Sequence, residues 1–238
     1  MNYENCSVLE LEKELLELSS KNDRESKKKY KDIDLYLCSL DNHRYEKKYY
    51  NLGYELIAGV DEVGRGPLVG PVVASAVILP KGYNLEGLTD SKKLSEKKRD
   101  YFYDIIMRDA ISVGIGVVDN FKIDEVNIYE ATKIAMKDAI SNLEVSPDVI
   151  LTDAMKFDSD VILEPIIKGD IKSITIAAAS VIAKVTRDRM MYELDKKYPM
   201  YNFKSNKGYP TRDHVLAIKE YGLLDEHRRT YGICKEFK

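Results

Sequence analysis

Acidic side chains stand where three predicted strands begin or end. Asp61 and Glu62 are adjacent after the apolar run LIAGV, Asp153 follows VILT, and Asp170 precedes the β-branched stretch KSITI. Carboxylates brought together repel one another unless a cation lies between them, and Mg²⁺ and Mn²⁺ prefer oxygen ligands. Several converging carboxylates therefore predict a two-metal phosphodiester site, where one ion activates water and the other stabilises the leaving oxygen. Taken one at a time, each acid is also explained as a turn residue or a helix cap.

An arginine between two glycines follows the first acidic pair. Gly64 and Gly66 would let the backbone turn and approach a ligand closely. Their N–H groups and the fork of Arg65 can bind sugar or phosphate oxygens. The alternative is a tight turn that carries an exposed arginine. Within a regular strand Asp61 and Glu62 would point to opposite faces, so both reach one site only if the strand ends and turns here.

Periodic apolar residues predict the elements that must position these side chains. Strands are expected over residues 55–61, 68–79, 111–118, 148–153 and 172–176, the first two as a hairpin-like pair. Helices are expected over residues 9–18, weakly over 25–50, then over 95–110 after the cap Ser95, 127–143, 177–198, and 211–222 after the cap Thr211. Strands first, then strands alternating with helices, predict an α/β fold with a mixed β-sheet flanked by helices.

The same patterns predict two parts of the chain. Residues 1–53 form a helical N-terminal extension, and residues 54–238 form the catalytic domain. Within that domain, the helical C-terminal segment from about residue 199 to 238 would bind substrate. The extension is expected to be dispensable for chemistry, although it could contribute to substrate grip.

Composition narrows the class of protein. Hydrophobic residues make up 44% and charged residues 32%, which is ordinary for a globular protein with a real core. No stretch approaches the roughly 18–20 apolar residues of a membrane span, and the acidic N-terminus does not resemble a secretory signal. The three widely spaced cysteines include no C-x-x-C pair. They favour free thiols in a reducing cytoplasm over a zinc site or a disulfide framework.

Charge is distributed unevenly along the chain. The net charge is −3, but residues 184–238 contain thirteen Lys and Arg against eight Asp and Glu. A basic C-terminal part beside an acidic body suits a protein that holds a phosphate backbone against a carboxylate-rich site. The alternative is a merely solvated helical surface.

A series of motifs then resembles one enzyme family, ribonuclease HII, the bacterial type 2 ribonuclease H. The resemblance covers about residues 56–232, most of the chain. Its segments are GVDEVGRGPLVGPVVASAVIL, DSKKLSEKKR, NIYEATKIAM, VILTDAMKF, KGDIKSITIAAASVIAKVTRDRMM, NKGYPTRDH and GLLDEHRRTY. It implies a ribonuclease H-like mixed sheet that would hydrolyse the RNA strand of RNA–DNA hybrids. It also implies nicking of duplex DNA 5′ of an embedded ribonucleotide, which leaves 3′-hydroxyl and 5′-phosphate ends.

The resemblance assigns roles to single residues. The divalent metal, Mg²⁺ or Mn²⁺ as two ions with substrate bound, would be held by Asp61, Glu62, Asp153 and Asp170. Gly64, Arg65 and Gly66 would sense the 2′-hydroxyl, the group that distinguishes RNA from DNA. Tyr209 would pack on the neighbouring deoxyribose, or else merely cover a helix end.

Basic residues in the matching segments are candidates for phosphate contacts. They are Lys92, Lys184 and Arg187, and the last two, three residues apart, can share a helix face. Solvated helix surface is the alternative for all three. His214, His227 and Arg228 are given no catalytic step, and structural histidines are expected.

The protein is expected to be a monomer. Two rival functions remain open. A ribonuclease HIII-like hybrid nuclease normally carries a strand-containing N-terminal domain, whereas residues 1–52 are short and helical. A non-catalytic hybrid-binding module should lack one of the four acids, and this chain keeps all of them.

Many relatives have glycine after the third acid, where this chain has Ala154 after Asp153. Metal binding should survive that change, because the carboxylate itself is kept.

Overall fold

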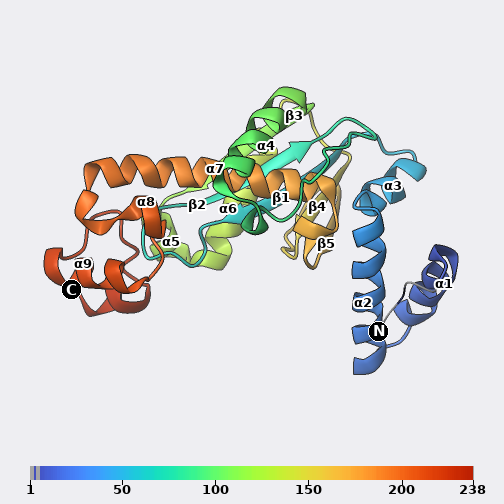
Figure 1. Cartoon of the computed structure of the whole chain (residues 1–238), viewed down its shortest axis with the longest axis horizontal. Helices are drawn as coiled ribbons and strands as arrows, with labels where there is room; N and C mark the ends of the chain where they lie inside the picture. Colours follow the sequence, from blue (N-terminus) through green and yellow to red (C-terminus); the bar gives the residue numbers. More distant parts are fainter. Residues whose placement is uncertain (1–2, 4–5, 238) are drawn as a thin grey trace.

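The computed structural model describes residues 3 and 6–237 and contains one mixed β-sheet (Figure 1). Its strands are β1 (Ile57–Val63), β2 (Val72–Ile78), β3 (Ser112–Val118), β4 (Val149–Asp153) and β5 (Ile162–Ile166). They lie in the order β3-β2-β1-β4-β5. The pairs β1–β2 and β2–β3 are antiparallel, while β4 runs parallel to both β1 and β5. The predicted hairpin-like pair and the mixed sheet are confirmed.

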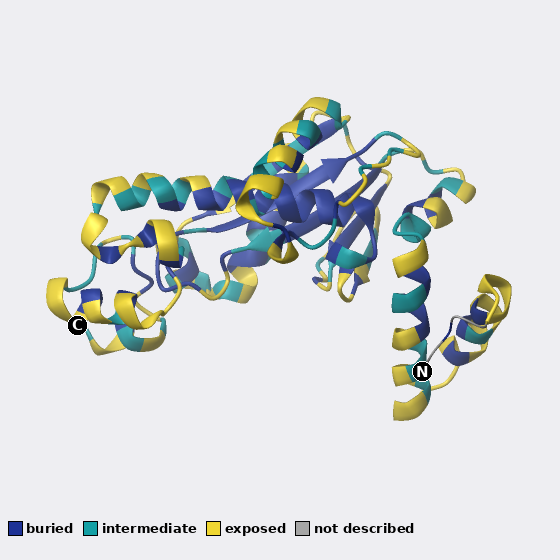
Figure 2. Cartoon of the chain, in the orientation of Figure 1, coloured by how far each residue is buried: buried dark blue, intermediate teal, exposed yellow. Residues whose placement is uncertain are grey.

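Helices cover both faces of the sheet. They are α4 (Glu96–Asp109) and α7 (Ile174–Lys197) on one face, and α5 (Asn120–Val126) and α6 (Ile128–Ser141) on the other. The buried residues therefore gather along the sheet and the inner helix faces (Figure 2). Glycines allow the closest contacts between the layers. A Cβ at Gly59 would lie 2.1 Å from the backbone carbon of Thr175, and one at Gly116 would lie 2.0 Å from the carbonyl oxygen of Ala135.

Capping residues begin the helices where the sequence predicts. The Ser95 side chain accepts a hydrogen bond from the Lys98 N–H at the start of α4. Thr211 does the same for the His214 N–H at the start of α9 (Arg212–Tyr221). Each cap satisfies one of the free N–H groups that every helix leaves in its first turn.

The strand predicted over residues 172–176 is wrong. Ser173 instead caps α7, and its hydroxyl accepts from the Ile176 N–H at 3.2 Å. The β-branched run favours a strand locally, but here it forms the buried first turn of a helix that packs on β1. The fifth strand is β5, in a segment expected to be a loop. Asp170 accordingly lies in a short 3-10 helix, η2 (Gly169–Ile171), and not before a strand.

The two ends of the chain lie at opposite ends of the molecule (Figure 1). Residues 8–51 hold α1 (Val8–Ser19), α2 (Arg24–Leu40) and α3 (Arg44–Asn51), so the weak helical stretch 25–50 is two helices. The C-terminal part holds η3 (Pro199–Tyr201), α8 (Phe203–Asn206), α9 and η4 (Gly232–Glu236). A short 3-10 helix, η1 (Ser91–Lys93), precedes α4. No helix of the described residues is long and apolar enough to cross a membrane.

Candidate active site

The four acids occupy neighbouring ends of parallel strands. Asp61 and Glu62 lie near the end of β1, Asp153 ends β4, and Asp170 follows β5 in η2. The Gly169 N–H donates to Asp153 Oδ1 at 2.9 Å, which ties η2 to the end of β4. Asp61 and Asp170 are only 5% and 7% exposed.

The first strand was expected to end at Asp61, and it ends two residues later. β1 continues to Val63, and both acids remain paired with β2, Asp61 opposite Ser75 and Glu62 opposite Ala74. The turn begins at Gly64, where φ is +97°. The two carboxylates still belong to one electrostatic group, because the charge of Asp153 acts on both.

Mutual repulsion and burial perturb this group. Burial raises the pKa of Asp61 well above its usual range, and the charges of Glu62 and Asp153 raise it further. Burial also raises the pKa of Glu62, although nearby Arg65 opposes this shift. The pKa of Asp170 is raised to about 6 by burial, then by Asp153 and by Asp90. Such a group is stabilised when a cation or a proton enters it.

The donor set fits a hard divalent cation. All four side chains offer carboxylate oxygens, and Glu62 Oε2 is buried without a hydrogen-bond partner. Lys92 Nζ, 4.0 Å from Asp170 Oδ2, already brings positive charge to the site. Within the described residues, however, no three His, Cys, Asp or Glu side chains are arranged so that they could hold an ion by themselves. A bound ion would therefore need further oxygens, from rotated carboxylates, water or substrate.

A buried arginine supports the Gly64–Gly66 loop through hydrogen bonds to its backbone. Arg228 Nη2 donates to the Gly64 carbonyl at 2.6 Å, and its Nη1 donates to the Arg65 carbonyl at 3.1 Å. The side chain of Arg65 is 46% exposed, and its Nη1 lies 3.3 Å from Glu62 Oε1. The loop thus presents a partly exposed guanidinium that is paired with Glu62 directly beside the other carboxylates.

Arg187 also supports this loop, which argues against the phosphate contact expected of it. Its side chain is 0% exposed and donates to the carbonyls of Val69, Pro71 and Lys207 at 3.0 to 3.1 Å. A Cβ at Gly64 would lie 2.4 Å from Arg187 Nε, so only glycine fits there. Periodicity missed the burial of Arg187 and Arg228, because each depends on a distant loop folding over it.

Tyr209 lies beside the same loop. Its Cε1 would be 3.3 Å from a Cβ at Gly66, and the residue is 41% exposed. The His214 Nδ1 lies 2.9 Å from the Tyr209 carbonyl oxygen, within hydrogen-bonding distance. The tyrosine ring therefore borders the loop while its backbone is anchored. Packing against a deoxyribose stays a prediction.

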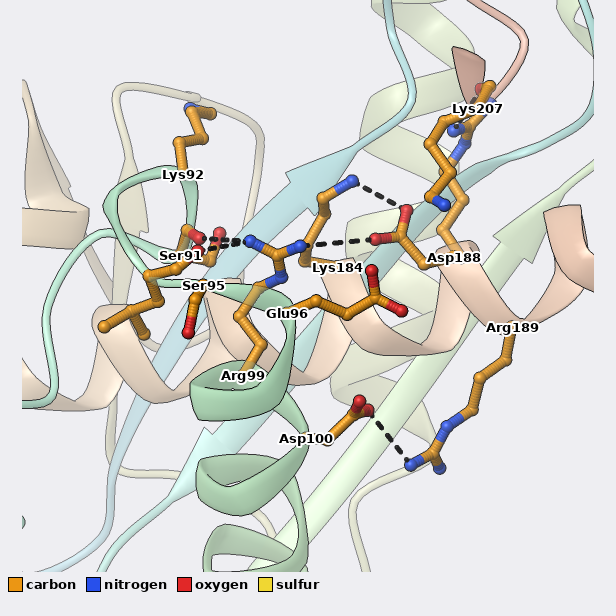
Figure 3. A network of polar contacts seen from close by, with 12 residues as sticks. Ser91, Lys92, Ser95, Glu96, Arg99, Asp100, Lys184, Asp188, Arg189 and Lys207 are labelled. Atoms are coloured by element: carbon orange, nitrogen blue, oxygen red, sulfur yellow. Dashed lines mark hydrogen bonds and ion pairs between the residues drawn. The ribbon is translucent and has the colours of Figure 1, made fainter. Parts of the chain in front are cut away.

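Lys184 belongs to a polar network that the sequence analysis did not find (Figure 3). Its Nζ donates to Asp188 Oδ1 at 2.6 Å, and Arg99 Nη2 lies 3.9 Å from Asp188 Oδ2. Arg99 in turn donates to the Ser91 carbonyl at 3.2 Å. The i,i+4 spacing of Lys184 and Asp188 was the available signal. Lys92 points away from this network, so the two lysines serve different surroundings.

The mixed sheet with carboxylates at the ends of β1 and β4 defines the class of protein, an endonuclease of the ribonuclease H class. Its fold is similar to the crystal structure of ribonuclease H2 from Pyrococcus horikoshii OT3, with a TM-score of 0.61 and 30% identity. That match covers 76% of this chain and 96% of the other.

Sequence comparison specifies the family. A family profile described as Ribonuclease HII matches residues 58–232. Ribonuclease HII of Bacillus subtilis strain 168 is 56% identical over 194 residues, covering 82% of this chain and 76% of the relative. That of Acetivibrio thermocellus is 57% identical over 189 residues, covering 79% and 73%. The chain belongs to the ribonuclease HII family.

Proposed function

We propose that this protein is a divalent-metal-dependent endonuclease for RNA–DNA hybrids and for single ribonucleotides in duplex DNA. It hydrolyses the RNA strand of hybrids and nicks 5′ of an embedded ribonucleotide, leaving 3′-hydroxyl and 5′-phosphate ends. The observation that supports this proposal best is the direct junction of the buried acids with the Gly64–Gly66 loop. The acids would supply the chemistry, and the loop would select the scissile bond.

Each group of side chains has a task in this proposal. Asp61, Glu62, Asp153 and Asp170 would hold Mg²⁺ or Mn²⁺, which supplies charge stabilisation and a nucleophilic water when bound. The backbone of Gly64 to Gly66, fixed by the buried arginines, can approach a ribose closely. Arg65 offers several N–H donors to sugar or phosphate oxygens. Tyr209 can cover the adjacent sugar from the other side of the loop.

The lysines near the carboxylates would bind phosphate. Burial alone would lower the pKa of Lys92, but the charges of Asp61 and Asp170 outweigh it and raise that pKa. Lys184 is held in place by Asp188. The Lys92 ammonium group therefore remains charged at neutral pH, and both lysines offer N–H donors that suit a backbone phosphate.

We further propose that the protein works as a monomer in the cytoplasm. Cys6, Cys38 and Cys234 are all free thiols, and the last two are buried. A reducing compartment suits this arrangement, since free thiols persist there.

A DNA duplex with one ribonucleotide tests the proposal. The wild-type protein with Mg²⁺ or Mn²⁺ should nick 5′ of that ribonucleotide, and without metal it should not. Asp61→Asn and Asp170→Asn should lower the rate by at least about a thousandfold while substrate binding is retained. Asp160→Asn, which changes an exposed acid between β4 and β5, is the matched control and should cleave normally.

Three results would contradict the proposal. Full activity in either active-site variant would remove the metal assignment. Cleavage only of hybrids with several consecutive ribonucleotides would favour a ribonuclease HIII-like specificity. Binding without any cleavage, with either metal, would favour a hybrid-binding module.

A further inference from the structure

The extension helix α3 is joined to the first turn of α7 by a buried glutamate. Glu46 is 1% exposed, and its Oε1 accepts hydrogen bonds from Ser173 Oγ at 2.5 Å and from Thr175 Oγ1 at 2.8 Å. It also accepts from the Thr175 backbone N–H at 3.1 Å. That N–H is one of the free donors in the first turn of a helix. Glu46 therefore completes the cap of α7 from outside the catalytic domain.

A buried ion pair joins α2 to the residue just before this turn. Asp34 is paired with Lys172, and each side chain is only 8% exposed. Tyr45 OH adds a hydrogen bond to Asp34 Oδ2 at 3.2 Å. Lys172 is two residues from Asp170, and its own N–H donates to the Gly169 carbonyl, closing η2. We name the set Asp34, Glu46, Lys172, Ser173 and Thr175 the N-terminal clasp.

The segment inside the clasp contacts both acid-bearing parts of the site. Upstream it continues directly into η2 and Asp170. On its inner side, the Thr175 backbone packs on β1 at Gly59, where a Cβ would be only 2.1 Å from it. Gly59 is two residues from Asp61. The first turn of α7 thus packs between the extension and β1, the strand that carries the acidic pair.

Burying an ion pair costs desolvation energy that a surface contact would avoid. The extension nevertheless docks through charges that are buried at this one turn. This costly contact is explained if catalysis depends on the position of the turn. A misplacement of about 1 Å at a catalytic group can lower a rate a hundredfold. We propose that Asp34 and Glu46 are positioning residues that act through Lys172, Ser173 and Thr175 to fix Asp170. This inference rests on the proposed function, and it opposes the expectation that residues 1–53 are dispensable.

Glu46→Ala tests the clasp in the full-length protein. We expect kcat for the single-ribonucleotide duplex to fall by roughly tenfold to a hundredfold, with KM within about twofold. Amide hydrogen exchange of residues 169–172, measured on the free protein, should accelerate by about tenfold. Glu46→Gln should keep most of the wild-type kcat and most of the protection of residues 169–172, because its Oε1 still accepts the three hydrogen bonds.

Lys48→Ala is the matched control on the same helix. Lys48 Nζ pairs with Glu164 Oε2 on β5 at 2.8 Å, so this variant removes a contact between extension and sheet that bypasses Asp170. It should leave kcat and the exchange of residues 169–172 unchanged. If Glu46→Ala does not fold, the double variant Asp34→Leu with Lys172→Met carries the same test, since apolar pairs commonly replace buried ion pairs without loss of stability.

Two results would overturn the inference. One is wild-type kcat and exchange in a folded Glu46→Ala variant or, where that does not fold, in the double variant. The other is a raised KM with unchanged kcat, which would make the extension a substrate grip only. Hydrogen exchange needs neither substrate nor metal. A wild-type protein that fails to nick would therefore refute the proposed function separately, while the exchange experiment still decides the clasp.

Discussion

Arg187 and Arg228 are two buried arginines that use their donors on backbone carbonyls of the 64–71 loop. Burial and, to a smaller extent, the charge of Arg228 lower the pKa of Arg187 to about 10. Both guanidinium groups remain charged at neutral pH. Their planar forks reach several carbonyls at fixed angles, which an ammonium group does not. The loop beside the acids is therefore built on two rigid supports.

Arg187→Lys should destabilise the protein by roughly 2–4 kcal/mol, because a lysine cannot reach all three of the buried or partly buried carbonyls that the arginine fork now bonds. Urea unfolding at pH 7.5 measures this change. Arg189→Lys on the exposed side of α7 is the control, and we expect a change within about 0.5 kcal/mol. Unchanged stability with weaker substrate binding would instead restore the phosphate contact first expected of Arg187.

The candidate acids could be predicted from sequence, and their supports could not. Asp61, Glu62 and Asp153 follow apolar runs whose strand character is local, so their positions at strand ends can be inferred from short segments. Arg187 looks like any charged residue on a long helix. Its burial depends on a loop more than a hundred residues away in sequence, which periodicity does not detect.

At the scale of elements, α6 approaches β3 as closely as backbone allows. A Cβ at Gly116 would lie 2.0 Å from the Ala135 carbonyl oxygen and 2.8 Å from the Ala139 nitrogen. Both atoms belong to helix backbone, so no side chain can rotate away. The small residues on the two elements thus set the separation between this helix and the sheet.

Gly116→Ala should lower the free energy of unfolding by roughly 2–3 kcal/mol, because the added methyl group must displace α6. The control is Val117→Ala, the next residue on β3, whose side chain is 44% exposed. That change should cost less than about 1 kcal/mol. Thermal and urea unfolding of both variants measures the two changes in the free energy of unfolding. Equal stability of the two would mean that the layers adjust without cost.

Elements with local signals were predictable, and those fixed by tertiary contacts were not. Ser95 and Thr211 mark helix starts by their own hydrogen bonds. The KSITI stretch has strand-forming residues, yet Ser173 caps a helix there because β1 offers Gly59 for close packing. β5 was missed since it is an edge strand, includes Pro165, and buries only its last residue.

At the scale of the molecule, the sheet is held from two opposite ends (Figure 1). The N-terminal helices contact η2 and α7 near Asp170 through the clasp. The C-terminal part contacts the Gly64–Gly66 loop through Arg228. Asp170 and the Gly64–Gly66 loop therefore lie beside separate appended parts of the chain. We expect each end to respond separately when its own contacts are changed.

The C-terminal end contains two buried histidines, which makes its stability sensitive to acid. His214 and His227 are both 0% exposed, and their Nε2 atoms lie 3.4 Å apart. Burial and, to a smaller extent, His214 lower the pKa of His227 to about 4. Burial also lowers the pKa of His214. Because the histidines take up protons more readily when unfolded, stability is retained above about pH 6.5 and is lost as the pH falls toward 4.

We therefore expect the free energy of unfolding to fall by up to about 3 kcal/mol between pH 7 and pH 4.5 on account of His227. His227→Asn keeps an acceptor for the Leu224 N–H, which now donates to His227 Nδ1 at 2.9 Å. It should flatten part of the pH dependence while lowering stability at pH 7. Urea unfolding across this range measures both effects. Because His227 adjoins Arg228, acid should also lower the protection factors of amides in the 64–71 loop before those of residues 169–172. Simultaneous loss of protection at both places would mean that the two ends open as one unit.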